Sequence, residues 1–159
     1  RPTALEQKGK VEIPDLGVTL TAKADRVDLD DTGQLYIYDY KTGTPPSQDQ
    51  QKHFDRQLLL EAVIAEQAGF GEMAPGPVAS AVFIGLGSGG KIVDAPLNEE
   101  PVPKVWQEFN DLMRAYQEPD RGYTSRRAMH KKTDRGDYDQ LARFGEWDIT
   151  DPPDKTELG

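Results

Sequence analysis

The strongest constraint on the fold is a concentrated apolar stretch in the middle of the chain. From about His53 to Ala68 the sequence has the pattern of a helix, and Gly69 and Gly71 end it. Its apolar positions cover most of the circumference: Leu58, Leu59, Leu60, Ala62, Val63, Ile64 and Ala65. A helix with apolar side chains nearly all round is covered by other elements. We therefore predict a largely buried helix over residues 53–68.

The first 40 residues alternate between apolar and polar positions, as β-strands do. The pattern predicts a short strand at 11–13, a long one at 18–29 and a third at 35–40, with a turn at 30–33. The apolar phase slips near Asp25, which predicts a bulge or bend there. Together these segments make an antiparallel β-meander.

The second half of the chain adds a further strand pair and a helix. Residues 78–93 read as two strands joined by a glycine-rich turn, and residues 102–116 as an amphipathic helix. The order predicts an α/β domain with a mixed sheet and flanking helices. Because no repeat or interdomain linker is visible, we assign residues 1–118 to a core and 119–159 to a C-terminal extension of the same domain.

Composition excludes several classes of protein. The 159 residues include no cysteine, which excludes disulfides, thiolate catalysis, cysteine-bound zinc and iron–sulfur clusters. No apolar run approaches the roughly 18 residues that span a bilayer, so we expect a cytoplasmic protein with no membrane partner. The chain starts without methionine, and we expect it to be a piece of a larger protein.

The charge is unevenly distributed. A net charge of −9 argues against a free-standing nucleic-acid binder. Residues 121–135, however, contain six Lys or Arg against one acid, beside Tyr123. This segment fits phosphate contacts to DNA, docking on an acidic partner or a solvated tail. The residues predicted to contact nucleic acid are Arg126, Arg127, Lys131 and Lys132.

Two carboxylates and a lysine suggest chemistry. Asp25 and Asp39 lie on strands joined by a short turn, and Lys41 shares the strand face of Asp39. Neighbouring carboxylates attract a hard divalent cation, and a lysine beside them can orient water or stabilise charge on a phosphate. An exposed, salt-bridged hairpin gives the same short pattern.

The surrounding residues make the pattern more specific. Asp25-Arg26-Val27-Asp28, followed by Asp39-Tyr40-Lys41-Thr42-Gly43, resembles the RecB-like branch of the PD-(D/E)XK nuclease superfamily. The resemblance implies a restriction-endonuclease-like mixed sheet with flanking helices, and metal-dependent hydrolysis of DNA. The N-terminal core helix of that fold would be missing here. In this family the helix after the lysine carries a glutamine, which Gln57 matches.

The resemblance also implies roles for individual residues. Asp25 and Asp39 would bind the metal together with the backbone carbonyl of Tyr40. Lys41 would position the attacking water and the scissile phosphate, and Gln57 would contact Lys41 or the nucleic-acid backbone. The metal would be Mg²⁺, with Mn²⁺ able to substitute.

The chain departs from the family pattern at three places. Ala22 replaces a glycine, and Glu61 stands where the family has a tyrosine four residues after the glutamine. The superfamily also takes an acidic or histidine ligand from a helix before the first strand. Neither histidine precedes Asp25, so position alone makes Glu6 the candidate.

The C-terminal segments 122–128 and 136–147 are similar to the end of the AddB family of nuclease subunits. That likeness implies an exonuclease domain that resects broken DNA ends in recombinational repair, with an AddA-like helicase–nuclease subunit as partner. Two alternatives stay open. One is another RecB-like exonuclease, and the other is a non-catalytic nuclease-fold module that binds DNA ends or a partner.

Two other segments imitate known motifs. Asp28 to Gly33 begins like a calcium-binding loop, but strands flank it, so we interpret it as an acidic hairpin turn. Gly85 to Gly90 resembles a phosphate loop but lacks the following helix and the lysine, so we interpret it as a hairpin.

Overall fold

The computed structural model describes residues 2–87, 89–126, 128–129, 131, 133–148 and 150–156. Its internal contacts divide the chain into two compact units, residues 1–117 and 118–159, and each is described by itself. The assignment of the C-terminal extension to the same domain as the core stays a prediction. No helix among the described residues is long and apolar enough to cross a membrane.

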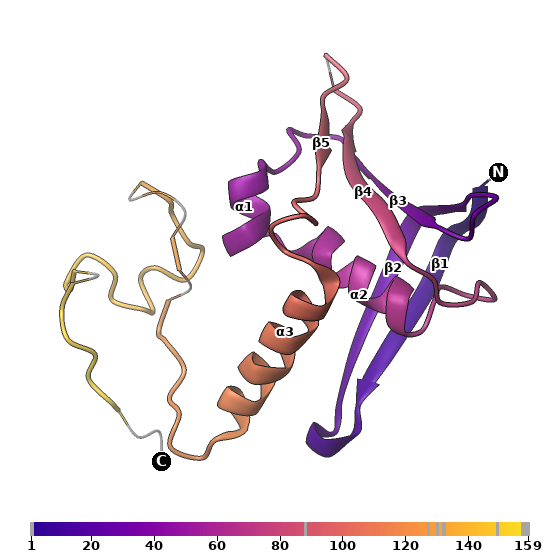
Figure 1. The fold of residues 1–159 in the computed structure, drawn as a ribbon. Helices are drawn as coiled ribbons and strands as arrows, with labels where there is room; N and C mark the ends of the chain where they lie inside the picture. Colours follow the sequence, from indigo (N-terminus) through magenta and orange to yellow (C-terminus); the bar gives the residue numbers. More distant parts are fainter. Residues whose placement is uncertain are drawn as a thin grey trace. The chain divides into compact units, whose positions relative to one another are not determined.

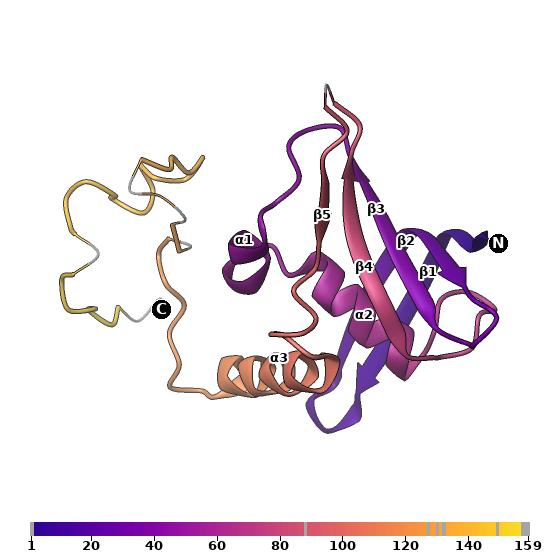
Figure 2. The same ribbon diagram turned by 45° about the horizontal axis from the view of Figure 1, so that its top comes forward.

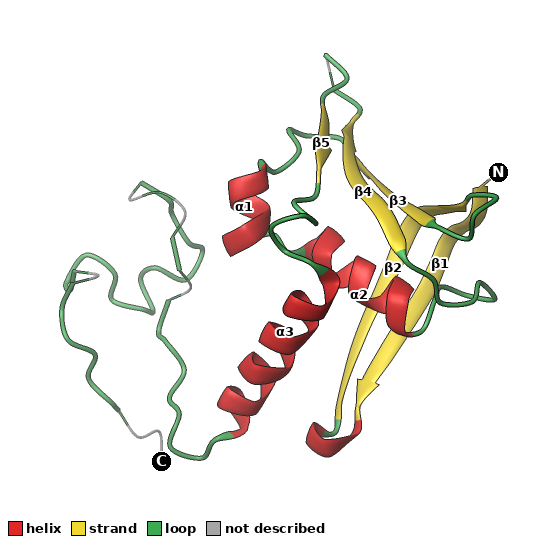
Figure 3. Cartoon of the chain, in the orientation of Figure 1, coloured by secondary structure: helices red, strands yellow, loops and turns green. Residues whose placement is uncertain are grey.

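The first unit is built on a five-stranded sheet in the order β1-β2-β3-β4-β5 (Figure 1). The strands are β1 (Pro2–Ile13), β2 (Val18–Leu29), β3 (Leu35–Lys41), β4 (Val78–Gly85) and β5 (Ile92–Asp94). β3 and β4 are parallel, whereas every other neighbouring pair is antiparallel. The sheet is therefore mixed, and helices flank it as predicted (Figure 3).

The parallel pair requires a crossover connection, and two helices supply it. They are α1 (Gln48–His53) and α2 (Gln57–Gln67). The prediction of one helix over 53–68 was wrong at its start, because His53 ends α1 and residues 54–56 separate the two helices. Ser47 starts α1 with a capping box: its side chain accepts from the backbone of Gln50, whose side chain accepts from the backbone of Ser47.

The core lies between the sheet and α2, and α3 (Val102–Gln117) packs against α2 (Figure 2). The predicted burial of the central helix is confirmed, since Leu58, Leu59 and residues 61–65 are all buried. In α3 only Val102 and Val105 are buried, and Leu112 and Tyr116 are exposed. The apolar stripe of α3 therefore joins the core mainly through its first turns.

Strand β1 is much longer than the predicted 11–13. It begins at Pro2 and pairs with β2 along its length at the edge of the sheet; a short 3₁₀ helix (Pro14–Leu16) joins the two. Where the phase slip near Asp25 predicted a bulge, the unusual backbone lies opposite, at Glu6 of β1, whose φ is +53°. On β2 both Ala24 and Val27 are buried, so the strand changes its buried face between them.

Candidate active site

The sheet divides where the two aspartates lie. The ladder between β2 and β3 ends at the pair Arg26↔Tyr38, so the next facing positions are Asp25 and Asp39. Beyond this point β2 continues only with β1, and β3 continues with β4 as far as Lys41 (Figure 1). The backbone N–H of Tyr40 donates to Asp25 Oδ2 at 2.9 Å, which ties the two branches together.

Asp39 and Lys41 lie on the face of β3 that is covered by α2. Asp39 is 5% exposed and continues the buried positions of Leu35 and Ile37. Lys41 Nζ lies 2.9 Å from Asp39 Oδ2 as an ion pair and 5.0 Å from the ring centroid of Phe83. The predicted shared face of Asp39 and Lys41 is therefore seen directly.

Gln57 joins these two residues from the first position of α2. Its Nε2 donates to Asp39 Oδ1 at 2.5 Å, and its Oε1 accepts from Lys41 Nζ at 2.8 Å. The same Nε2 donates to Glu61 Oε1 at 2.9 Å. One amide thus connects both charged groups of β3 to the helix.

Glu61 is the residue of this cluster to which sequence reasoning gave no role. It is 2% exposed, and burial raises the pKa of its carboxyl to about 7. The nearby charges of Asp39 and Asp25 raise the pKa further, and the hydrogen bond from Gln57 opposes the rise. The signal available in the sequence was an acid four residues after the glutamine, within the otherwise apolar run of residues 58–65.

The cluster has carboxylate oxygens available for a cation. Asp39 Oδ2 and Glu61 Oε2 are buried and accept no hydrogen bond; the Lys41 contact to Asp39 Oδ2 is an ion pair without hydrogen-bond geometry. Among the described residues no group of three or more Asp, Glu, His or Cys side chains forms a ready metal site. Asp25 and Asp39 nevertheless offer the oxygen donors that hard divalent ions prefer, and such ions retain several waters as ligands.

Glu6, the candidate for the upstream ligand, lies away from this cluster. Glu6 pairs with Lys23 on the exposed surface of the β1–β2 hairpin, so the structure does not bring it to Asp39. His53 ends α1 and is exposed. A metal-binding role for the Tyr40 carbonyl stays a prediction.

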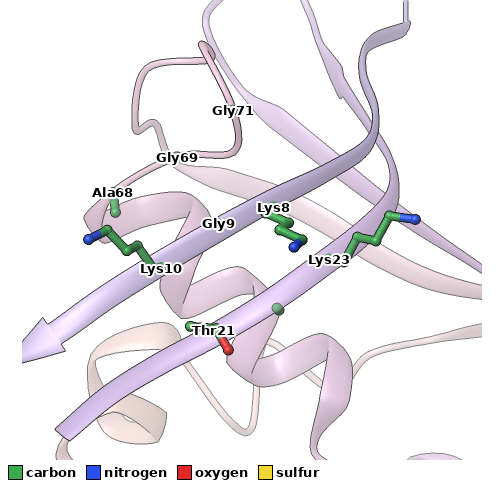
Figure 4. Close-up of a pocket in the computed structure, with 9 residues that line it drawn as sticks. Lys8, Gly9, Lys10, Thr21, Lys23, Ala68, Gly69 and Gly71 are labelled. Atoms are coloured by element: carbon green, nitrogen blue, oxygen red, sulfur yellow. The ribbon is translucent and has the colours of Figure 1, made fainter.

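A separate pocket lies on the β1–β2 hairpin beside the end of α2 (Figure 4). Its charged lining consists of Lys8, Lys10 and Lys23, and no residue of the Asp39 cluster contributes to it. Lys10 and Lys23 are paired with Glu12 and Glu6. The pocket is therefore distinct from the candidate active site.

In the second unit, the side chain of Arg126 contacts other residues of the same unit. Arg126 Nε donates to Asp139 Oδ1 at 2.6 Å, and Arg126 Cζ lies 4.1 Å from the ring centroid of Phe144. The side chain of Arg126 is 7% exposed. This geometry gives Arg126 a structural role, while Lys131 remains exposed. Arg127 and Lys132, the other predicted nucleic-acid contacts, lie outside the described residues, as does His130.

Comparison with known proteins agrees with this geometry. The family model of the PD-(D/E)XK nuclease superfamily matches residues 1–133. No curated protein matches the chain. The chain belongs to the PD-(D/E)XK nuclease superfamily, whose members typically use divalent metal ions.

Proposed function

We propose that this chain is a metal-dependent DNA exonuclease domain that hydrolyses phosphodiester bonds during resection of broken DNA ends. The observation that carries the proposal is the hydrogen-bonded cluster of Asp39, Lys41 and Gln57 at the point where the sheet divides. This cluster places an acid and a cation at an open end of a rigid strand. The superfamily membership supports phosphodiester hydrolysis as its reaction.

The residues of the cluster have separate tasks in this proposal. Asp25 and Asp39 would hold Mg²⁺ or Mn²⁺, which when bound supplies Lewis-acid stabilisation of the phosphate. An ammonium has three N–H donors, and Lys41 donates one of them to Gln57, while its contact with Asp39 is an ion pair without hydrogen-bond geometry. A further N–H can donate to a phosphate oxygen or to a water. Phe83 covers one side of the ammonium, and this partial desolvation strengthens such a contact.

Cleavage assays with defined DNA substrates test the proposal. We expect the chain to degrade linear duplex or single-stranded DNA with Mg²⁺ or Mn²⁺ and to leave closed circular duplex intact. Chelation with EDTA should stop the reaction. Lys41→Met should lower the rate about 100-fold or more, since it removes the charge that faces the phosphate. Lys104→Met is the matched control, because Lys104 is an exposed lysine of α3 that pairs with Glu100 and Glu108.

Equal rates for Lys41→Met and the parent chain would refute the proposal, as would cleavage of closed circles at the rate of linear DNA. The assay should also be run at several salt concentrations. Because the chain carries a net charge of −9, we expect weak DNA binding that falls as salt rises.

The membership of this chain in the AddB family is part of the proposal, and so is an AddA-like helicase–nuclease subunit as its partner. The C-terminal sequence likeness supports both. In such an assembly the partner would provide the motor and much of the positive surface for DNA. Co-purification with an AddA-type subunit, and a rise in cleavage in the complex, would test this part.

A second candidate is a non-catalytic module that binds DNA ends or a partner. One observation favours it, namely the lack of a ready group of three metal ligands among the described residues. This candidate predicts DNA binding without hydrolysis, and it predicts no loss of binding in Lys41→Met beyond that of Lys104→Met.

A further inference from the structure

Glu61 and Gln57 lie four residues apart on α2, and their side chains therefore share one face of the helix. They are joined by the hydrogen bond from Gln57 Nε2 to Glu61 Oε1. Glu61 is buried among apolar neighbours on the helix, and its Oε2 has no hydrogen-bond partner. A buried carboxylate with so few partners costs stability. Packing does not explain it, because an apolar side chain would fill the same space without that cost.

The hydrogen bonds around Gln57 specify one orientation of its amide. The two N–H groups of Nε2 are directed at two carboxylates, Asp39 Oδ1 and Glu61 Oε1, while Oε1 faces the ammonium of Lys41. Turning the amide over would place its carbonyl oxygen against two acceptors and its N–H groups against a cation. Asp39 and Lys41 already favour this orientation, and Glu61 adds to the preference because it accepts from the N–H group that Asp39 does not use.

We propose that Glu61 is a positioning residue that fixes the amide of Gln57 and, through it, the ammonium of Lys41. The inference rests on the proposed nuclease function of the Asp39 cluster. Glu61 lies in the middle of the buried helix α2, and the packing of this helix restrains its position. The carbonyl of Gln57 then holds Lys41 Nζ at the end of β3 from a direction that Asp39 does not provide.

The first test does not depend on activity. Side-chain amide signals of Gln57 are assigned by NMR in the full chain and compared with those of Glu61→Met and Glu61→Gln. Met keeps the length and the helix propensity but removes the strong acceptor, whereas Gln keeps an acceptor oxygen. We expect one Gln57 N–H signal to move upfield and exchange faster in Glu61→Met, and to stay near its original position in Glu61→Gln.

Glu66→Met is the matched control on the same helix. Glu66 Oε1 accepts from the backbone of Val78, away from the cluster, so this change should leave the Gln57 signals in place. Should Glu61→Met not fold, Glu61→Ala removes the same acceptor with less bulk. Unchanged Gln57 amide signals in the folded variant that lacks the acceptor would overturn the inference.

The second test is kinetic. We expect Glu61→Met to lower kcat about tenfold, which is the effect of losing one hydrogen bond, and to change KM less than about twofold. Glu61→Gln should restore most of the rate. In a Gln57→Met background, Glu61→Met should have no further effect on kcat, because the route from Glu61 to Lys41 is already broken.

If Glu61→Met and Gln57→Met lowered kcat independently, so that their effects multiplied, Glu61 would not act on Lys41 through Gln57. This result would contradict the inference even if the NMR spectrum of Gln57 had changed. A different result would refute the proposed nuclease function. A parent chain without Asp39-dependent cleavage would refute the nuclease proposal, and the Gln57 signals would still decide whether Glu61 orients the amide.

Discussion

Replacing Glu61 by glutamine should change how the stability of the first unit depends on pH. Burial raises the pKa of the Glu61 carboxyl from 4.5 to about 7. The folded state therefore binds this proton more tightly than the unfolded state does. The stability contributed by protonated Glu61 is fully present below about pH 4.5 and is lost as pH rises towards 7, after which the penalty is constant.

The size of the effect follows from the shift. Because the pKa rises from 4.5 to about 7, ionised Glu61 lowers the free energy of unfolding by about 3 kcal/mol at alkaline pH. Glutamine has no titrating proton. The free energy of unfolding of Glu61→Gln should therefore rise by about 3 kcal/mol relative to that of the parent chain between pH 4.5 and pH 8. A buried amide with an unpaired N–H lowers stability equally at all pH values, so the pH dependence of the difference is the quantity to measure.

Urea unfolding at pH 4.5 and pH 8, with EDTA present, measures this difference. The circular dichroism signal of helices is suitable, because the helices of the described residues all lie in the first unit. At an m-value of about 2 kcal/mol/M, the unfolding midpoint of Glu61→Gln should move relative to the parent by about 1.5 M urea between the two pH values. A constant difference between the two proteins would show that Glu61 titrates normally, and the reasoning about its burial would be refuted.

Three further predictions concern other parts of the molecule. Gly9→Ala should destabilise the first unit by about 1–3 kcal/mol in urea unfolding, because the new Cβ would lie 2.5 Å from Ile64 Cγ2. Gly87→Ala, where only the Thr42 carbonyl oxygen lies within 4 Å, at 3.6 Å, is its control, and equal stabilities of the two variants would contradict the packing of β1 on α2. Mg²⁺ or Mn²⁺ at about 100 times its Kd should stabilise the chain by about 2.7 kcal/mol, seen as a rise in Tm, and Asp39→Asn should abolish the rise. A rise that persists in Asp39→Asn would place the ion elsewhere. The Arg126 guanidinium holds the pKa of Asp139 below its usual range. Ionised Asp139 therefore stabilises the second unit at pH values above the pKa that Asp139 has in the unfolded chain, and this stabilisation is lost as the pH falls through the lower pKa of the folded state. Trp147 fluorescence should report that acid transition in the parent chain, and its persistence in Asp139→Asn would contradict the assignment.

Much of the fold could be predicted from short-range patterns. The alternation in β2 and β3 predicted their bounds closely, and it placed Asp39 and Lys41 on one face because side chains alternate along a strand. The burial of α2 followed from its apolar circumference. These features depend only on residues near each other in the chain.

The features that were missed depend on distant partners. Most of β1 is polar because it is an edge strand, so alternation did not reveal it. The start of α1 is visible in the sequence, because Ser47 and Gln50 have the spacing of a capping box. The spacing of Gln57 and Glu61 predicts a shared helix face, whereas only the packing of α2 on β3 brings that face to Asp39. The ion pair of Arg126 with Asp139, 13 residues away in the chain, could not be predicted from the basic segment alone.

In the proposed function, Asp39 lies at the centre of a metal-dependent nuclease site. The most direct test is the single-turnover cleavage rate of linear DNA with Mg²⁺ for Asp39→Asn and for Asp49→Asn, whose carboxylate is exposed on α1. Asparagine keeps the shape of the side chain and removes its charge. We expect a loss of about 100-fold or more in Asp39→Asn and of less than about twofold in Asp49→Asn. Equal rates for the two variants would contradict the proposed nuclease function.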